Sequence, residues 1–290
     1  MEEFCAYHRD GDGECNAILL KEYADANGLK AKDRFDLAYF FSITYCCESG
    51  VILFLNRGMD LYALKDDMIF QSDRKYVRMK DYFERLIYQW QNSLSHYDTT
   101  KWFENGVLSL EKAIKDVEKW YMFGRFSAFL FLEPYATLMN TPVTNTTIDW
   151  EHGDTATSGL LNLFGHDEFA TDFDRKGILQ VPVDKMDGYL KKTAENVKLS
   201  GGDPNTTKIE TSLCAYRKFY KGTRYNGYYL DRMLEELAWY QRERPQHIRV
   251  TEELYNIRKT VFDSDLLGEL HGWGGIRKEN KKLYMLYGII

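Results

Sequence analysis

The chain has 290 residues, of which 44% are hydrophobic, 15% aromatic and 28% charged, and its mean hydropathy is −0.49. This composition is typical of a folded protein with a substantial core, and it excludes a disordered chain or an integral membrane protein. A net charge of −6 argues against a protein that coats nucleic acid through bulk charge, although a local basic groove is compatible with it.

The sequence shows no export or anchoring signal. The longest apolar stretches, Phe126–Leu132 and Val51–Leu55, are far shorter than the roughly 20 residues that cross a bilayer. Five cysteines occur without CxxC spacing, which indicates free thiols and a reducing compartment. We therefore expect a cytoplasmic protein.

Apolar residues at three- and four-residue spacing, separated by glycines and polar caps, predict helices along most of the chain. In chain order the expected helices are Glu14–Asn27, Arg34–Asn56 with Asp33 as its N-cap, Leu61–Phe70, Lys75–Leu94, a helix from Asp98 or Thr99 to about Trp120, Tyr121–Asn140, Lys185–Leu199, Thr207–Tyr220, Tyr228–Arg242 and Thr251–Val261.

The segment Thr141–Lys185 has few periodic apolar residues, so loops and short helical turns are expected there. No sustained strand alternation is visible. The predicted fold class is all-α, a multi-helix globular bundle with a long irregular connection in the middle. The predicted organisation is one helical domain over 1–290, or two helical halves, 1–140 and 186–290, joined by 141–185.

Several common catalytic motifs are missing from the sequence. It contains no GxxxxGK[ST], GxSxG, HExxH or HxE with PCxxC, so P-loop, α/β-hydrolase, zincin and zinc-deaminase chemistry are unsupported. The six histidines are scattered, and no metal site is expected.

The most apolar predicted helix carries Arg125, Ser127 and Glu133. A charge within such a helix must be paired or must face a ligand, because an isolated charge in a low-dielectric interior is costly. Two interpretations stay open: an Arg–Glu pair that holds the bundle together, and an anion site in a helical cleft.

A second group of polar residues lies in the predicted helix Thr207–Tyr220. Glu210, Cys214 and Arg217 fall on one face at i, i+4 and i+7, with Lys218 beside them. The following segment, Arg224–Arg232, combines cations with tyrosines and includes Tyr228, Tyr229 and Asp231; such a set could hold phosphates and stack a base. A solvated mixed-charge face is the alternative for both.

Near the end of the chain, Glu269 and Trp273 could add a carboxylate and an aromatic platform. A packing motif of the C-terminal segment is the alternative.

Taken in order, these segments resemble the helical amino acid:DNA transferase family of bacteriophages that hypermodify thymine. The resembling segments are Gly124–Ser127 with Glu133, Glu210–Lys218, Arg224–Arg232, and Leu266–Glu269 with Trp273–Ile276. They span roughly the C-terminal two thirds of the chain. The helical module attached to hydroxymethyluracil DNA kinases and the thymine pyrophosphorylase clade are related alternatives.

The resemblance implies that an amino acid replaces the pyrophosphate of pyrophosphorylated 5-hydroxymethyluracil in DNA, through its amino group. The partners would be DNA with a modified pyrimidine and a free amino acid, in the host cytoplasm if the chain is of phage origin. No redox or nucleotide cofactor is expected, because the leaving group already activates the carbon; a divalent metal could accompany the pyrophosphate.

This chemistry needs cations for the leaving group, a carboxylate for the amine and a platform for the extruded base. As a hypothesis, Glu210 or Asp231 acts on the amine, Arg217, Lys218 and Arg224 hold the pyrophosphate or DNA backbone, Arg125 binds an anion such as the amino acid carboxylate, Tyr228, Tyr229 or Trp273 stacks on the base, and Ser127, Glu133 and Glu269 complete the substrate site.

Two other functions fit the same residues. In a non-catalytic helical DNA-binding or assembly protein, the arginines would only grip phosphates. In a plain interaction module, the Arg–Glu pairs would be structural.

Overall fold

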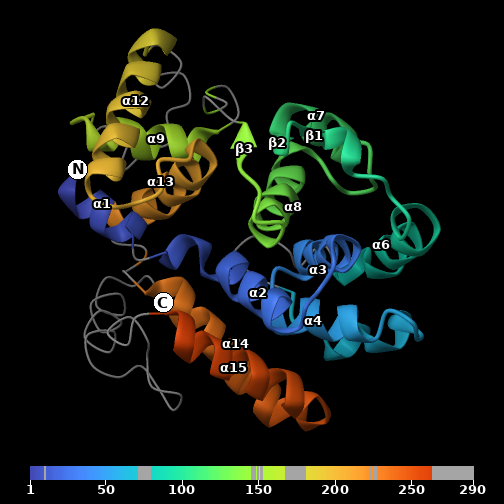
Figure 1. The fold of residues 1–290 in the computed structure, drawn as a ribbon. Helices are drawn as coiled ribbons and strands as arrows, with labels where there is room; N and C mark the ends of the chain where they lie inside the picture. Colours follow the sequence, from blue (N-terminus) through green and yellow to red (C-terminus); the bar gives the residue numbers. More distant parts are fainter. Residues whose placement is uncertain are drawn as a thin grey trace. The chain divides into compact units, whose positions relative to one another are not determined.

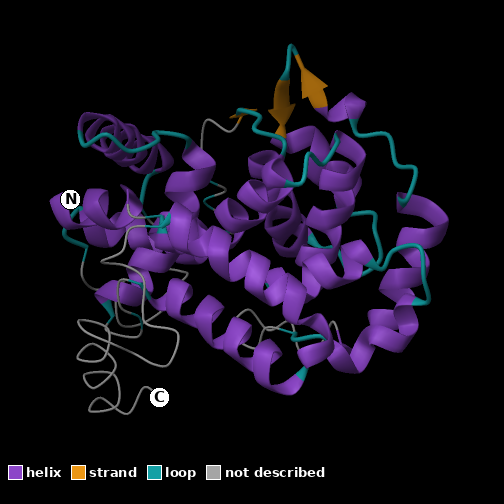
Figure 2. Cartoon of the chain, turned by 60° about the horizontal axis from the view of Figure 1, so that its bottom comes forward, coloured by secondary structure: helices purple, strands orange, loops and turns teal. Residues whose placement is uncertain are grey.

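The protein was analysed as a computed structural model that describes residues 1–9, 11–70, 80–144, 148, 150, 153–166, 181–221, 224 and 227–262. Helices dominate these residues, and three short strands form the one sheet found among them (Figure 2). The predicted all-α class is confirmed. No helix in the described ranges is both long enough and apolar enough to cross a membrane.

Contacts group the described residues into two compact units. Unit 1 contains those within Met1–Cys15 and Asn145–Asp231, and unit 2 contains those within Asn16–Thr144 and Arg232–Phe262. Each unit is therefore built from segments distant in sequence. The single-domain organisation of the whole chain stays a prediction.

Unit 1 is a helical assembly (Figure 1), and aromatic side chains form part of its core. Its helices are α1 (Glu2–Arg9), the 3₁₀ turn η1 (Asp12–Glu14), α9 (Asp154–Leu163), α12 (Val183–Leu199) and α13 (Thr206–Tyr220). The ring of Phe4 in α1 packs edge-on against Tyr216 in α13, with 5.3 Å between ring centroids. Helix α1, which the sequence analysis did not anticipate, is thus part of the core.

Unit 2 contains the remaining elements. Helix α14 (Tyr228–Glu243) begins in unit 1 and continues into unit 2. Its other elements are α2 (Cys15–Ala26), α3 (Ala31–Thr44), α4 (Cys47–Leu55), η2 (Leu61–Asp67), α6 (Phe83–Gln89), the π-helical turn η3 (Trp90–Leu94), η4 (Thr100–Trp102), β1 (Phe103–Glu104), β2 (Val107–Ser109), α7 (Leu110–Val117), α8 (Arg125–Leu138), β3 (Val143–Thr144), η5 (Pro245–His247) and α15 (Ile248–Val261).

The core of unit 2 is an aromatic cluster. Phe131 in α8 stacks on Tyr135 at 5.7 Å and lies 5.2 Å from Trp120, while Phe35 in α3 meets Phe131 edge-on at 5.6 Å. Trp102, which is fully buried, packs edge-on against Tyr135, with 5.9 Å between ring centroids. Such aromatic contacts stabilise the core beyond the area they bury.

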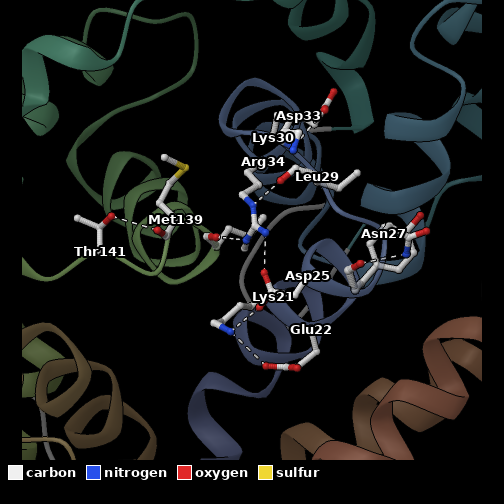
Figure 3. Close-up of polar contacts among 12 residues, drawn as sticks. Lys21, Glu22, Asp25, Asn27, Leu29, Lys30, Asp33, Arg34, Met139 and Thr141 are labelled. Atoms are coloured by element: carbon white, nitrogen blue, oxygen red, sulfur yellow. Dashed lines mark hydrogen bonds and ion pairs between the residues drawn. The ribbon is translucent and has the colours of Figure 1, made fainter. Parts of the chain in front are cut away.

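Arg34 ties three helices of unit 2 together (Figure 3). Its Nε donates to the carbonyl of Leu29 at 2.8 Å, one terminal nitrogen donates to the Leu138 carbonyl at the end of α8, and the other pairs with Asp25 of α2 at 2.5 Å. An arginine at a helix end satisfies backbone carbonyls that the helix leaves without partners.

The predicted helix Arg34–Asn56 is wrong as a single element. The chain breaks at Tyr45, whose φ is 55°, and the segment forms α3 and α4 instead. Lys30 is the N-cap of α3, and Asp33 at N3 accepts its backbone N–H at 3.4 Å. Continuous hydrophobicity concealed the break, because both helices are buried.

The predicted helix from Asp98 or Thr99 to Trp120 is also wrong in its first half. Residues 103–109 form an antiparallel hairpin, β1 with β2, and β2 pairs in parallel with β3. The turn is Asn105-Gly106, with φ values of 51° and 79°. An Asn-Gly pair adopts positive φ at low cost and is a strong hairpin signal, which the helical periodicity around it masked.

Other helix boundaries in the structure differ less from the predicted ones. Helix α8 starts at Arg125 rather than Tyr121, because Met122 has a φ of 64°. The segment expected as irregular, Thr141–Lys185, contains the ten-residue helix α9. The expected helix Leu61–Phe70 is a 3₁₀ helix ending at Asp67, and the start of Lys75–Leu94 lies outside the described residues.

Candidate functional site: a polar seam between α9 and α13

Helix α13 positions the residues that the sequence singled out. It starts at Thr206, and the side chain of its N-cap Asn205 accepts the Thr207 N–H at 2.9 Å. Glu210, Cys214 and Arg217 lie along one face of the helix, and each is partly exposed.

Helix α9 supplies the partner of Arg217. The Nε of Arg217 donates a hydrogen bond to the hydroxyl of Ser158 at 2.8 Å. Burial lowers the pKa of Arg217, and the nearby Asp154 and Cys214 offset this only in part. An arginine retains its charge under such a shift, so α9 and α13 hold a cation that is partly withdrawn from water.

A close approach of the two helices sets this geometry. A Cβ atom added to Gly159 would lie 2.4 Å from the carbonyl oxygen of Leu213, closer than atoms can pack. Glycine is therefore required at this crossing, and the neighbouring Ser158 is brought to Arg217 because the backbones nearly touch.

Asn162 lies one helical turn beyond Ser158 on α9 and is 6% exposed. Neither its amide nitrogen nor its amide oxygen has a hydrogen-bond partner among the described residues. A buried amide without partners is costly, so such a group calls for a water or a ligand. It offers both a donor and an acceptor.

These side chains form what we call the α9–α13 seam. It consists of Asp154, Ser158 and Asn162 on α9, and of Glu210, Cys214 and Arg217 on α13. Sequence reasoning found the α13 half and missed the α9 half. The spacing of the three α9 residues at i, i+4 and i+8 was the available signal, but it lies in a segment assigned to loops.

Further candidate residues gather just after α13. The backbone N–H of Arg224 donates to the Lys218 carbonyl at 3.1 Å, and the Arg224 guanidinium lies over the ring of Tyr228, 4.1 Å from its centroid. Tyr228 meets Tyr229 edge-on at 5.3 Å. The Arg224 guanidinium and the Tyr228 ring are thus brought together, next to the backbone of Lys218.

Tyr229 and Asp231 differ from Tyr228 in exposure. They are 9% and 3% exposed respectively, whereas Tyr228 is partly exposed. Of the two tyrosine rings, that of Tyr228 is the more accessible to a base.

The candidates on α8 belong to unit 2. Arg125 is the first residue of the helix and is exposed, so the expectation of a charge inside an apolar helix is corrected: the helix begins at this arginine. Ser127 and Glu133 are partly exposed. Glu269 and Trp273 lie outside the described residues.

A helical protein with a partly buried arginine, neighbouring cations and an accessible tyrosine has the features of one that binds an anionic ligand. A model of the amino acid:DNA transferase family matches residues 50–225, more than half of the chain. The chain belongs to this family. The matched range contains the whole α9–α13 seam together with Lys218 and Arg224.

Searches of curated proteins and of solved structures found no significant match.

Proposed function

We propose that the protein joins an amino acid, through its amino group, to the 5-methylene of pyrophosphorylated 5-hydroxymethyluracil in DNA. The neutral amine nitrogen forms a bond to the methylene carbon, the bond from that carbon to the pyrophosphate oxygen breaks, and the nitrogen gives up one of its two protons to become a secondary amine. The family match supports a transferase that uses an amino acid and DNA. The observation that carries the finer proposal is Arg217, held by Ser158 in the seam.

Arg217 is suited to the departing pyrophosphate. Charge-assisted hydrogen bonds from a guanidinium to phosphate oxygens strengthen where water is partly excluded, and charge on the leaving group grows in the transition state. Lys218 and Arg224 supply further positive charge for the pyrophosphate or the DNA backbone.

The amine needs a carboxylate that orients it and accepts its proton. Glu210 lies on the same face of α13 as Arg217, about 10 Å away along the helix axis. Asp231, at the start of α14, is the second candidate. We assign the extruded base to the ring of Tyr228.

No redox or nucleotide cofactor enters this proposal. Pyrophosphate is already a good leaving group, so the reaction is a substitution that needs positioned charges. A divalent ion could accompany the pyrophosphate.

The test is direct. The full chain is incubated with DNA carrying pyrophosphorylated 5-hydroxymethyluracil and a mixture of amino acids, and the DNA is digested to nucleosides for mass spectrometry. We expect a nucleoside whose mass corresponds to an amino acid adduct, and its mass identifies the amino acid.

Variants of Arg217 connect the activity to the seam. Arg217→Gln should lower the rate by about 100-fold or more, the usual cost of removing a group that stabilises transition-state charge. Arg217→Lys should retain part of the activity, because the charge remains while the planar donor geometry is lost. Arg242→Gln, at an exposed arginine paired with Glu243, is the control and should be unchanged.

The absence of any adduct, with intact donor DNA and folded protein, would contradict the transferase proposal. Salt-sensitive DNA binding that is independent of amino acids would then favour a binding protein.

A further inference from the structure

A second polar cluster lies in unit 2, away from the range of the family match. Cys46 is the N-cap of α4, Glu48 is in its first turn, and Glu236 is on α14. Their exposed fractions are 0%, 0% and 4%, and one ligand atom from each lies within 4.8 Å of the other two. A thiol and two carboxylates thus converge in the interior.

The distances within this cluster suit a metal ion. The Sγ of Cys46 lies 3.2 Å from Oε2 of Glu48. Sulfur and oxygen ligands of a tetrahedral zinc ion are about 3.6 Å apart, given typical metal–ligand bond lengths. A small movement of either side chain would therefore accommodate an ion between them.

One oxygen of the cluster is unsatisfied. Oε1 of Glu48 is buried and has no hydrogen-bond partner within the described part of the chain. A buried carboxylate oxygen without a partner is rare, because its desolvation is not compensated. An ion at this place would supply the missing interaction.

Other side chains lie next to the cluster of Cys46, Glu48 and Glu236. Tyr240, one turn after Glu236 on α14, shares a hydrogen bond of 2.7 Å with Ser49. Arg258 is 1% exposed, and its positive charge acts on Glu48.

Arg232 lies 3.5 Å from Glu236 and has Glu235 as a second partner at 3.4 Å.

The positive charges of Arg232 and Arg258 balance the negative charges of Glu48 and Glu236. The thiolate of Cys46 then adds the negative charge that favours a divalent ion. Arg232 is 33% exposed and can turn toward solvent and Glu235.

We infer that Cys46, Glu48 and Glu236 form a binding site for one thiophilic divalent cation of the zinc type. Thiolate ligation selects such ions over magnesium and calcium, which prefer all-oxygen sites. The ion would join α4 to α14 and stabilise unit 2. All three ligands lie outside residues 50–225, the range of the family match.

The experiment uses the full chain after treatment with a chelator and a phosphine reductant. Equilibrium dialysis against Zn²⁺, followed by elemental analysis, should give one equivalent per chain. Titration with Co²⁺ should produce the near-ultraviolet charge-transfer band of a thiolate–cobalt bond. Bound Zn²⁺ should also raise the melting temperature.

Cys47→Ser is the matched control, because Cys47 is adjacent, equally buried, and directs its sulfur to Asn16 instead. This variant should keep the band, and Cys46→Ser should lose both the band and the thermal shift. Glu236→Gln, which preserves the shape of the side chain, should weaken Zn²⁺ binding at least tenfold. It is the alternative test variant if Cys46→Ser does not fold.

A stoichiometry near zero would overturn the inference, as would cobalt binding without the band or a band that survives in Cys46→Ser. Adduct formation in the transfer assay is a separate readout, so failure of one proposal leaves the other standing.

Discussion

His8 is a buried histidine with both ring nitrogens engaged. Its Nε2 lies 2.9 Å from the carbonyl oxygen of Asp203, and its Nδ1 lies 2.6 Å from the hydroxyl of Ser212. A carbonyl only accepts, so Nε2 carries the hydrogen and Nδ1 of the neutral ring accepts from Ser212. This arrangement joins α1 to the middle of α13 and to the segment that precedes α13.

Burial lowers the pKa of His8 below its ordinary value of 6.5. The unfolded chain therefore takes up a proton near pH 6.5 while the folded chain does not, and stability falls as the pH decreases below that value. The His8 contribution to the free energy of unfolding should fall by up to about 1.4 kcal/mol per pH unit.

Urea unfolding at pH 7.5 and pH 5.5 measures this change in the free energy of unfolding for the wild-type protein and for His8→Gln. The wild-type protein should lose more stability at pH 5.5 than His8→Gln, which lacks the titrating ring. Glu14 has a raised pKa from burial, so its contribution changes in the opposite direction, but both proteins share it. Equal pH dependence in the two proteins would contradict the assignment.

At the scale of residues, the sequence indicated the α13 face because side-chain spacing on one helix follows from helical geometry alone. It could not indicate that Ser158 meets Arg217, since that contact depends on two helices crossing at Gly159. Asn162 was missed for the same reason.

At the scale of elements, the crossing of α9 and α13 is the contact on which the seam depends. Gly159→Ala would place a methyl group against the Leu213 backbone, which cannot move aside as a flexible side chain can. We expect a loss of about 1–3 kcal/mol in stability, the usual cost of overpacking.

Gly188→Ala in α12 is the matched change. A Cβ atom at Gly188 would have no heavy atom within 4 Å apart from its own helix and neighbours. Alanine is the better helix former, so this variant should gain up to about 1 kcal/mol. Urea unfolding followed by circular dichroism measures both, and equal effects would show that the close crossing is absent in solution.

Helix positions were predicted best where local signals agree. The cap at Asn205 and the positive φ of 61° at Gly28 mark helix boundaries that the sequence located. The breaks at Tyr45 and Asn105 were missed, because the flanking apolar residues satisfy helical periodicity whether or not the helix continues.

At the scale of the whole molecule, the net charge of −6 is unfavourable for DNA, so binding must depend on local cations. If Lys218 contacts a phosphate, replacing it with glutamine should reduce the slope of log K against log salt by about 0.9 for duplex DNA or 0.7 for a single strand.

Fluorescence anisotropy over a range of salt concentrations measures the slope. Lys119→Gln is the control, because Lys119 is exposed on the other unit and pairs with Asp116. An unchanged slope in Lys218→Gln would remove this lysine from the DNA contact.

The sequence by itself determined the helical class, the polar face of α13 and the family resemblance, because periodicity, capping and segment order are local properties of a chain. Only the tertiary structure decided that α1 joins α13, that α9 completes the seam and that Cys46 and Glu48 meet Glu236. Those contacts link residues far apart in the chain, and they form because burial of nonpolar surface selects which helices pack together.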